Sequence, residues 1–86
     1  MSAQELETLW RSRLREAHLR LEFARNLLKE VQRDGGDGHR RAIRLERLAL
    51  QEYRHLQQIL WDLQASGKVP DEEEWQRRTA PGAGLM

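Results

Sequence analysis

Hydrophobic residues recur every three or four positions from residue 6 to residue 31, the spacing of one face of an α-helix. These residues are Leu6, Trp10, Leu14, Ala17, Leu21, Ala24, Leu28 and Val31. Ser2 and Glu5 have the spacing of a capping box, in which the serine side chain accepts a hydrogen bond from an early backbone N–H. No proline or glycine interrupts the chain before Gly35. The pattern predicts a helix over residues 2–34.

A second hydrophobic stripe with the same period predicts a second helix over residues 39–66. The stripe consists of Leu45, Leu48, Ala49, Tyr53, Leu56, Ile59, Leu60 and Leu63. Gly67 follows the stripe, and glycine readily takes the left-handed conformation that ends many helices. The sequence DGGDG at residues 34–38 leaves only a turn over residues 35–38 between the two helices. So short a connection predicts an antiparallel helical hairpin.

The segment after Gly67 has the signals of a short third helix over residues 70–78. Pro70 suits the start of a helix, and the acidic run 71–74 complements the dipole of a first turn. Trp75 is the large apolar residue of this segment, and we expect it to pack with Val69 on the open end of the hairpin, near Trp10. Residues 80–86 have no periodicity and read as a disordered tail, so residues 1–79 form one helical domain.

The size of the chain predicts self-association. Two or three helices within 86 residues bury too little surface to be more than marginally stable alone. Two amphipathic helices of about 30 residues also leave a long apolar groove between them. We therefore expect an all-α fold in which two copies of the hairpin assemble as a dimeric four-helix bundle.

Several large apolar residues fall outside the two stripes and are candidates for a partner surface. They are Leu19, Phe23, Ile43, Leu50 and Trp61, to which Trp75 of the third helix is added. A surface of this kind fits a second copy of the chain or another protein.

Composition narrows the class of protein further. The chain has no cysteine, which removes disulfides, thiolate zinc sites and cysteine nucleophiles. Charged residues make up 34% of the chain but the net charge is only +1, which is typical of helix surfaces that carry ion pairs. The sequence shows no apolar run long enough to cross a bilayer and no hydrophobic leader, so a cytoplasmic protein is expected.

The turn end of the hairpin is basic, with the sequence HRRAIRLER at residues 39–47. Weak binding of nucleic acid through this end is one alternative function. Acidic residues lie among the basic ones, as at Asp34, Asp37 and Glu46, and nucleic-acid binders usually show a stronger imbalance. We therefore regard this function as the least favoured.

Glu52 and His55 are the candidates for metal chemistry, because a carboxylate lies inside the second stripe and the histidine at its margin. The spacing Glu-x-x-His is the one that ferritin-like proteins use to hold iron or manganese in a helical bundle. Such sites need further carboxylates, and those of the first helix lie at the edge of its stripe or beyond. In an antiparallel hairpin Arg20 lies level with Glu52, and Arg13 lies on the same flank. An Arg–Glu pair that fixes the helix register is therefore the favoured interpretation.

No serine or threonine stands with a histidine and an acid in a way that indicates a catalytic triad, so catalysis is not favoured. The sequence instead predicts a small protein–protein interaction or oligomerisation module without a cofactor. A metal-binding protein with a site at the dimer interface is the alternative from another class.

Overall fold

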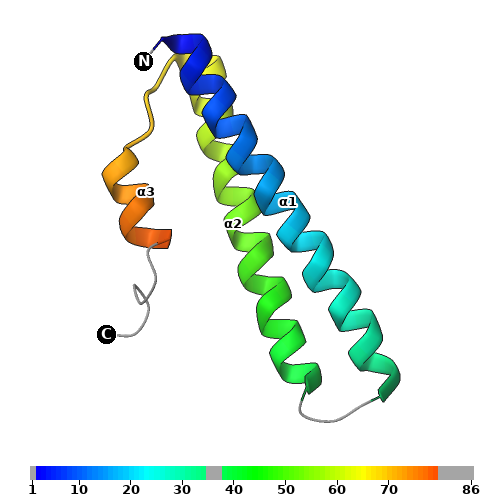
Figure 1. Ribbon diagram of the computed structural model, residues 1–86. Coiled ribbons are helices and arrows are strands. Elements are labelled where there is room, and N and C mark those ends of the chain that lie inside the picture. The colour runs from blue at the N-terminus through cyan, green and yellow to red at the C-terminus, as the bar shows by residue number, and fades with distance from the viewer. Residues whose placement is uncertain (1, 35–37, 80–86) are drawn as a thin grey trace.

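The computed structural model describes residues 2–34 and 38–79, and the ordered elements in these ranges are three helices (Figure 1). Helix α1 spans Ala3–Asp34, α2 spans Gly38–Ser66 and α3 spans Glu72–Thr79. The all-α fold with two long helices and a short third one is confirmed, and the ends of the long helices lie within a residue of those expected. The expected turn glycines at 35 and 36, and the expected tail at 80–86, lie outside the described residues.

Helix α1 begins where the capping signal predicted. The backbone N–H of Glu5 donates to the Ser2 hydroxyl oxygen at 3.2 Å, and the N–H of Leu6 donates to the Ser2 carbonyl at 3.0 Å. Because α1 has 32 residues, it is about 48 Å long at about 1.5 Å per residue. This single helix accounts for the longest dimension of the molecule, 49 Å.

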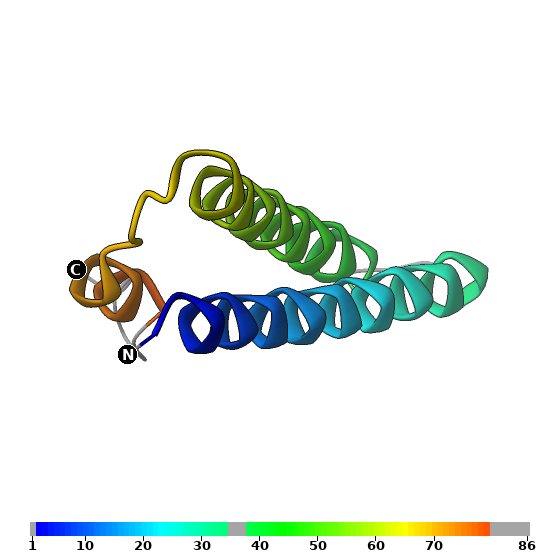
Figure 2. The same cartoon turned by 90° about the horizontal axis from the view of Figure 1, so that it is seen from above.

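The two long helices run antiparallel, side by side (Figures 1 and 2). Near the start of α1, the Gln64 amide donates to the Glu7 carboxylate at 2.8 Å. Further along α1, the Arg20 guanidinium contacts the Glu52 carboxylate at 2.5 Å. Contacts therefore move back along α2 as they move forward along α1, which is the register of a hairpin.

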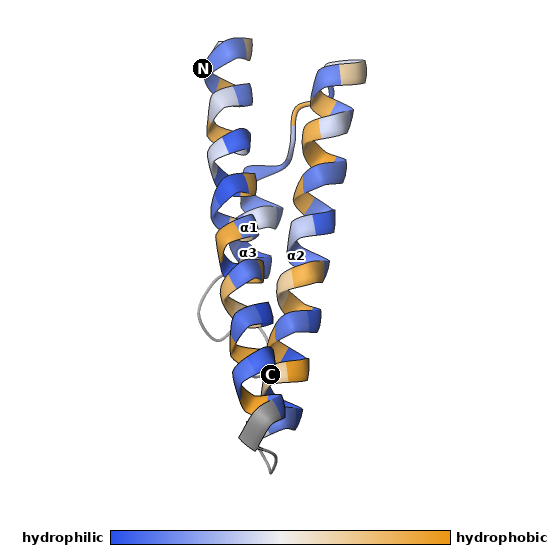
Figure 3. Cartoon of the chain, turned by 90° about the vertical axis from the view of Figure 1, so that its right-hand side faces the viewer, coloured by the Kyte–Doolittle hydropathy of each residue, from blue (hydrophilic) through white to orange (hydrophobic). Residues whose placement is uncertain are grey.

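The core lies between α1 and α2 and mixes large and small apolar side chains. Small residues allow two helix backbones to come close, while the large ones fill the remaining space. Hydrophobic segments recur along both long helices (Figure 3). The buried residues are Trp10, Ala17, Leu21, Ala24, Ala42, Leu56 and Leu60.

Helix α2 ends at a glycine, as predicted. Gly67 has a φ of +68°, and its N–H donates to the Leu63 carbonyl at 3.0 Å, the pattern of an αL cap. Helix α3 begins at Glu72 and not at Pro70, because Asp71 is its N-cap: the Asp71 side chain accepts from the N–H of Glu74 at 3.1 Å. The four residues between Gly67 and Glu72 let α3 turn back alongside the hairpin (Figure 1).

Two details of the predicted packing are wrong. Leu45 and Leu48 belong to the stripe of α2 but are 48% and 56% exposed, because the stripe is wider than a single neighbouring helix covers. Val69 was expected to pack with Trp75 but is 68% exposed, since it lies in the connection between helices and not on a helix face.

Candidate protein interaction site

Trp75 attaches α3 to the hairpin, as expected. It does so on the open-end half, which is the half away from the turn between α1 and α2. Its ring and that of Trp10 form a T-shaped pair, with 5.5 Å between the centroids and 74° between the ring planes. Trp10 is 1% exposed and belongs to the core cluster. Trp75 is half-buried and packs against that cluster. Trp75 is therefore a contact within the chain, although it was also a candidate for a partner surface.

Arg13 connects α1 to α3 by two kinds of contact. Its guanidinium carbon lies 4.5 Å from the centre of the Trp10 ring and 5.7 Å from that of Trp75, within the range of cation–π attraction. Its two terminal nitrogens donate to the two oxygens of Glu72 at 2.7 and 2.5 Å. These hydrogen bonds lower the pKa of Glu72 and raise that of Arg13, because each group stabilises the charged form of the other.

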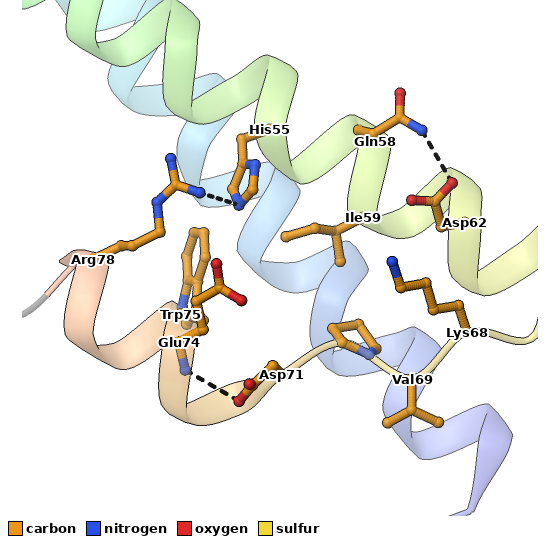
Figure 4. Close-up of a pocket in the computed structure, with 11 residues that line it drawn as sticks. His55, Gln58, Ile59, Asp62, Lys68, Val69, Asp71, Glu74, Trp75 and Arg78 are labelled. Carbon is orange, nitrogen blue, oxygen red and sulfur yellow. Dashed lines mark hydrogen bonds between the residues drawn. The ribbon is translucent and has the colours of Figure 1, made fainter.

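His55 faces α3 and not Glu52. Its ring stacks on Trp75 with 11° between the planes and 6.2 Å between the centroids. Figure 4 shows Arg78 and His55 pointing toward one another, with Arg78 Nη1 3.2 Å from His55 Nε2. Burial lowers the pKa of His55, the positive charge of Arg78 lowers it further, and Glu74 opposes both. The arrangement favours a neutral imidazole that accepts a hydrogen bond from Arg78 at Nε2.

A hollow of about 310 Å³ lies between α2, the connection before α3, and α3 itself (Figure 4). Its charged lining mixes both signs, because Asp62, Asp71 and Glu74 stand with Lys68 and Arg78. Gln58 holds Asp62 by a hydrogen bond of 3.0 Å. A lining that mixes positive and negative charges in this way does not favour one kind of ion.

The Glu52–Arg20 pair is present, as the favoured interpretation predicted. The Arg20 and Glu52 side chains are 54% and 30% exposed, so the pair lies at the surface of the helix interface and not in a dry core. Arg13, the other arginine considered for Glu52, instead pairs with Glu72.

The two residues of the Glu-x-x-His motif therefore have different neighbours. A metal ion at Glu52 would have to replace Arg20, and one at His55 Nε2 would have to replace Arg78. Within residues 2–34 and 38–79, no three histidine, aspartate or glutamate residues are grouped so as to hold a metal ion.

An apolar groove of about 460 Å³ lies between α1 and α2 on the turn-end half of the hairpin. Phe23 is 69% exposed and Leu19, one turn before it, is 57% exposed. Leu45 and Leu48 of α2 line the same groove. Arg20, Ala24, Ala49 and Glu52 complete its lining. Sequence reasoning found the two α1 residues but assigned Leu45 and Leu48 to the core.

The other partner-surface candidates do not join this groove. Trp61 is 66% exposed, whereas Ile43 and Leu50 are half-buried. None of the three lines the groove, because they lie on the other flank of α2. The structure thus brings Leu19 and Phe23 together with two leucines of α2, and leaves Trp61 on a separate part of the surface.

At the basic turn end, Arg40, Arg41 and Arg44 are exposed. Glu46 balances part of this charge through an ion pair of 3.7 Å with Arg25. None of the three helices described is both long enough and apolar enough to span a membrane. Comparison with protein families, with characterised proteins and with solved structures finds no match to this chain.

Proposed function

We propose that this protein is a helical interaction module and that the groove between α1 and α2 is its binding surface. The observation that carries the proposal is the exposure of four large apolar side chains around one groove, Leu19, Phe23, Leu45 and Leu48. Large apolar side chains that are exposed together around one groove often mark an interaction site on a monomer.

The proposed first partner is a second copy of the chain, which would give a dimeric four-helix bundle. Each hairpin offers an apolar face with the period of a helix, and a second hairpin presents the same period and length. Association would also supply the buried surface that a chain of 86 residues lacks. The proposal takes the cytoplasm as the compartment, since a chain without cysteine needs no oxidising environment to fold.

The test compares two aromatic residues of nearly equal exposure. Phe23 lies in the groove and Trp61 lies outside it, at 69% and 66% exposure. We expect sedimentation equilibrium to show a dimer, and Phe23→Ser to raise its dissociation constant at least about tenfold, or about 1.4 kcal/mol. Trp61→Ser should leave the dissociation constant unchanged. Both side chains are exposed in the monomer, so neither change should unfold the hairpin.

A monomer mass for the wild type across the micromolar range, together with a cooperative thermal transition, would contradict self-association. A dimer that Trp61→Ser weakens and Phe23→Ser leaves intact would place the interface on the other flank of α2.

A further inference from the structure

We infer that α3 competes within the chain for the surface that a second copy would cover. This inference rests on the proposed function, because it assigns a regulator to the same groove. In this arrangement α3 occupies the open-end half of the face between α1 and α2 and leaves the turn-end half free. Release of α3 then lengthens the surface available to the second copy.

The first support is the continuity of the two halves. Leu48, Glu52 and Arg20 line the apolar groove of the turn-end half. The same three residues line a hollow together with Trp75 and Arg78 of α3. The last turn of α3 therefore borders the free groove, and the two halves belong to one face of the hairpin.

The second support is the size of the groove compared with that of a stable protein interface. A stable interface takes about 20–30 residues on each partner, whereas the groove of the turn-end half is lined by eight. Under α3 lies the remaining apolar surface of this face. Trp10 belongs to it, since its ring contacts that of Trp75, and Ile59 lines the hollow beside Trp75. A second copy that replaced α3 would cover both halves and would bury more surface than the turn-end groove alone offers.

The third support is the small size of α3. Helix α3 has eight residues, and helices shorter than about 12 residues are marginal alone. Its side-chain contacts with the hairpin include those of Glu72, Trp75 and Arg78. Glu72 and Arg78 can each be reversed in charge without loss of a tryptophan, and Glu72 is the better choice because it accepts two hydrogen bonds from Arg13.

The experiment uses the full chain with one charge reversal inside this contact and a matched one outside it. Glu72→Lys places a lysine against Arg13, whereas Glu73→Lys makes the same change of charge at an exposed neighbour in α3. Acrylamide quenching of tryptophan at a concentration below dimerisation reports the release of α3. Sedimentation equilibrium gives the dissociation constant of the dimer.

We expect Glu72→Lys to increase quenching and to lower the dissociation constant by up to about a hundredfold. Each of the two copies contributes a gain of about tenfold when a released state populated at about one part in ten becomes the main one. Glu73→Lys should stay within about twofold of the wild type. The pair Arg13→Glu with Glu72→Lys restores the opposite charges and should return both readouts toward wild type. Trp75→Ala is a second way to release α3 and should also tighten the dimer.

The outcomes separate this inference from the proposed function. If Phe23→Ser weakens the wild-type dimer but Glu72→Lys and Trp75→Ala leave it unchanged or weaken it, the groove stands as an interface and competition by α3 is wrong. If wild type and both released variants stay monomeric, self-association fails and the inference fails with it. A wild type that forms a dimer, and a Glu72→Lys variant that forms the same dimer more tightly, would support both.

Discussion

Arg13 and Glu72 lie 59 positions apart in the chain and are joined by two hydrogen bonds, of 2.7 and 2.5 Å. The pair fixes the distance between α1 and α3, and it orients the arginine over the rings of Trp10 and Trp75. A bidentate pair constrains geometry more than a single contact does. The position of α3 therefore depends on the Arg13–Glu72 pair as well as on the packing of Trp75.

The docking of α3 should weaken as the pH falls below about 6.5. Docking lowers the pKa of His55 from its ordinary value of 6.5, because of burial and of the charge of Arg78. The released state therefore binds more protons in this range, so docking is fully favoured above pH 6.5 and loses stability as the pH falls toward the lowered pKa. Tryptophan quenching measured from pH 8 to pH 5 should rise on the acid side.

The matched control for this pH dependence is His55→Phe, which keeps an aromatic ring against Trp75 but removes the titrating group. Its quenching should be flat from pH 8 to pH 5. A second step is expected below pH 4.5, the ordinary value for Glu72, because Arg13 lowers the pKa of that carboxyl and its protonation ends the pair. An identical pH profile for His55→Phe and wild type would show that His55 is not the sensor.

Trp10→Ala should be the most destabilising of the single tryptophan truncations. Trp10 is 1% exposed and belongs to the main core cluster, whereas Trp61 is 66% exposed. Removing a buried tryptophan costs about 3–5 kcal/mol of unfolding free energy, while an exposed position usually changes it by less than about 0.5 kcal/mol. Urea denaturation of Trp10→Ala and Trp61→Ala measures the difference.

Trp10→Phe should cost much less than Trp10→Ala. Trp10 Nε1 is buried, and among the described residues it has no hydrogen-bond partner, which carries a penalty of about 1–3 kcal/mol. Phenylalanine removes this unpaired N–H while keeping most of the ring. The stability lost through the smaller side-chain volume is therefore offset by the stability gained when the unpaired N–H is removed. Similar losses for the two variants in the same denaturation experiment would show that Nε1 carries no penalty.

The Arg20–Glu52 pair should contribute about 1 kcal/mol or less to stability. Its side chains are 54% and 30% exposed, and pairs that water reaches contribute little. A double-mutant cycle with Arg20→Met and Glu52→Gln, followed by thermal denaturation, gives the coupling between them. If Glu52 instead bound iron or manganese, elemental analysis would find metal in the wild type that Glu52→Gln or His55→Ala removes, and the cycle would depend on that metal.

Gly67→Ala should destabilise the end of α2 by about 1 kcal/mol. Gly67 has a φ of +68°, and a Cβ built there meets no atom within 4 Å, so the cost comes from the backbone conformation and not from a clash. Gly38→Ala is the control, because Gly38 lies in the first turn of α2 and an added Cβ there meets Val31 at 3.4 Å. Thermal denaturation should show a loss for Gly67→Ala and little change for Gly38→Ala.

Local signals in the sequence determined the helices. The Ser2 cap, the absence of glycine and proline from residues 2–34, and the left-handed Gly67 act over a few residues. The antiparallel pairing also followed from the sequence, because a short turn returns the second helix along the first. From that register the Arg20–Glu52 contact could be predicted, because the prediction requires only the position of each residue along its helix.

The tertiary structure alone decided which apolar residues stay exposed and which polar groups meet. Periodicity places Leu45 and Leu48 on the apolar face of α2, but only the position of the neighbouring helix determines how much of that face is covered. The meeting of Arg13 with Glu72, and of His55 with Arg78, depends on where α3 returns after Gly67. No periodic pattern contains this information, because α3 is held by side-chain contacts between segments far apart in the chain.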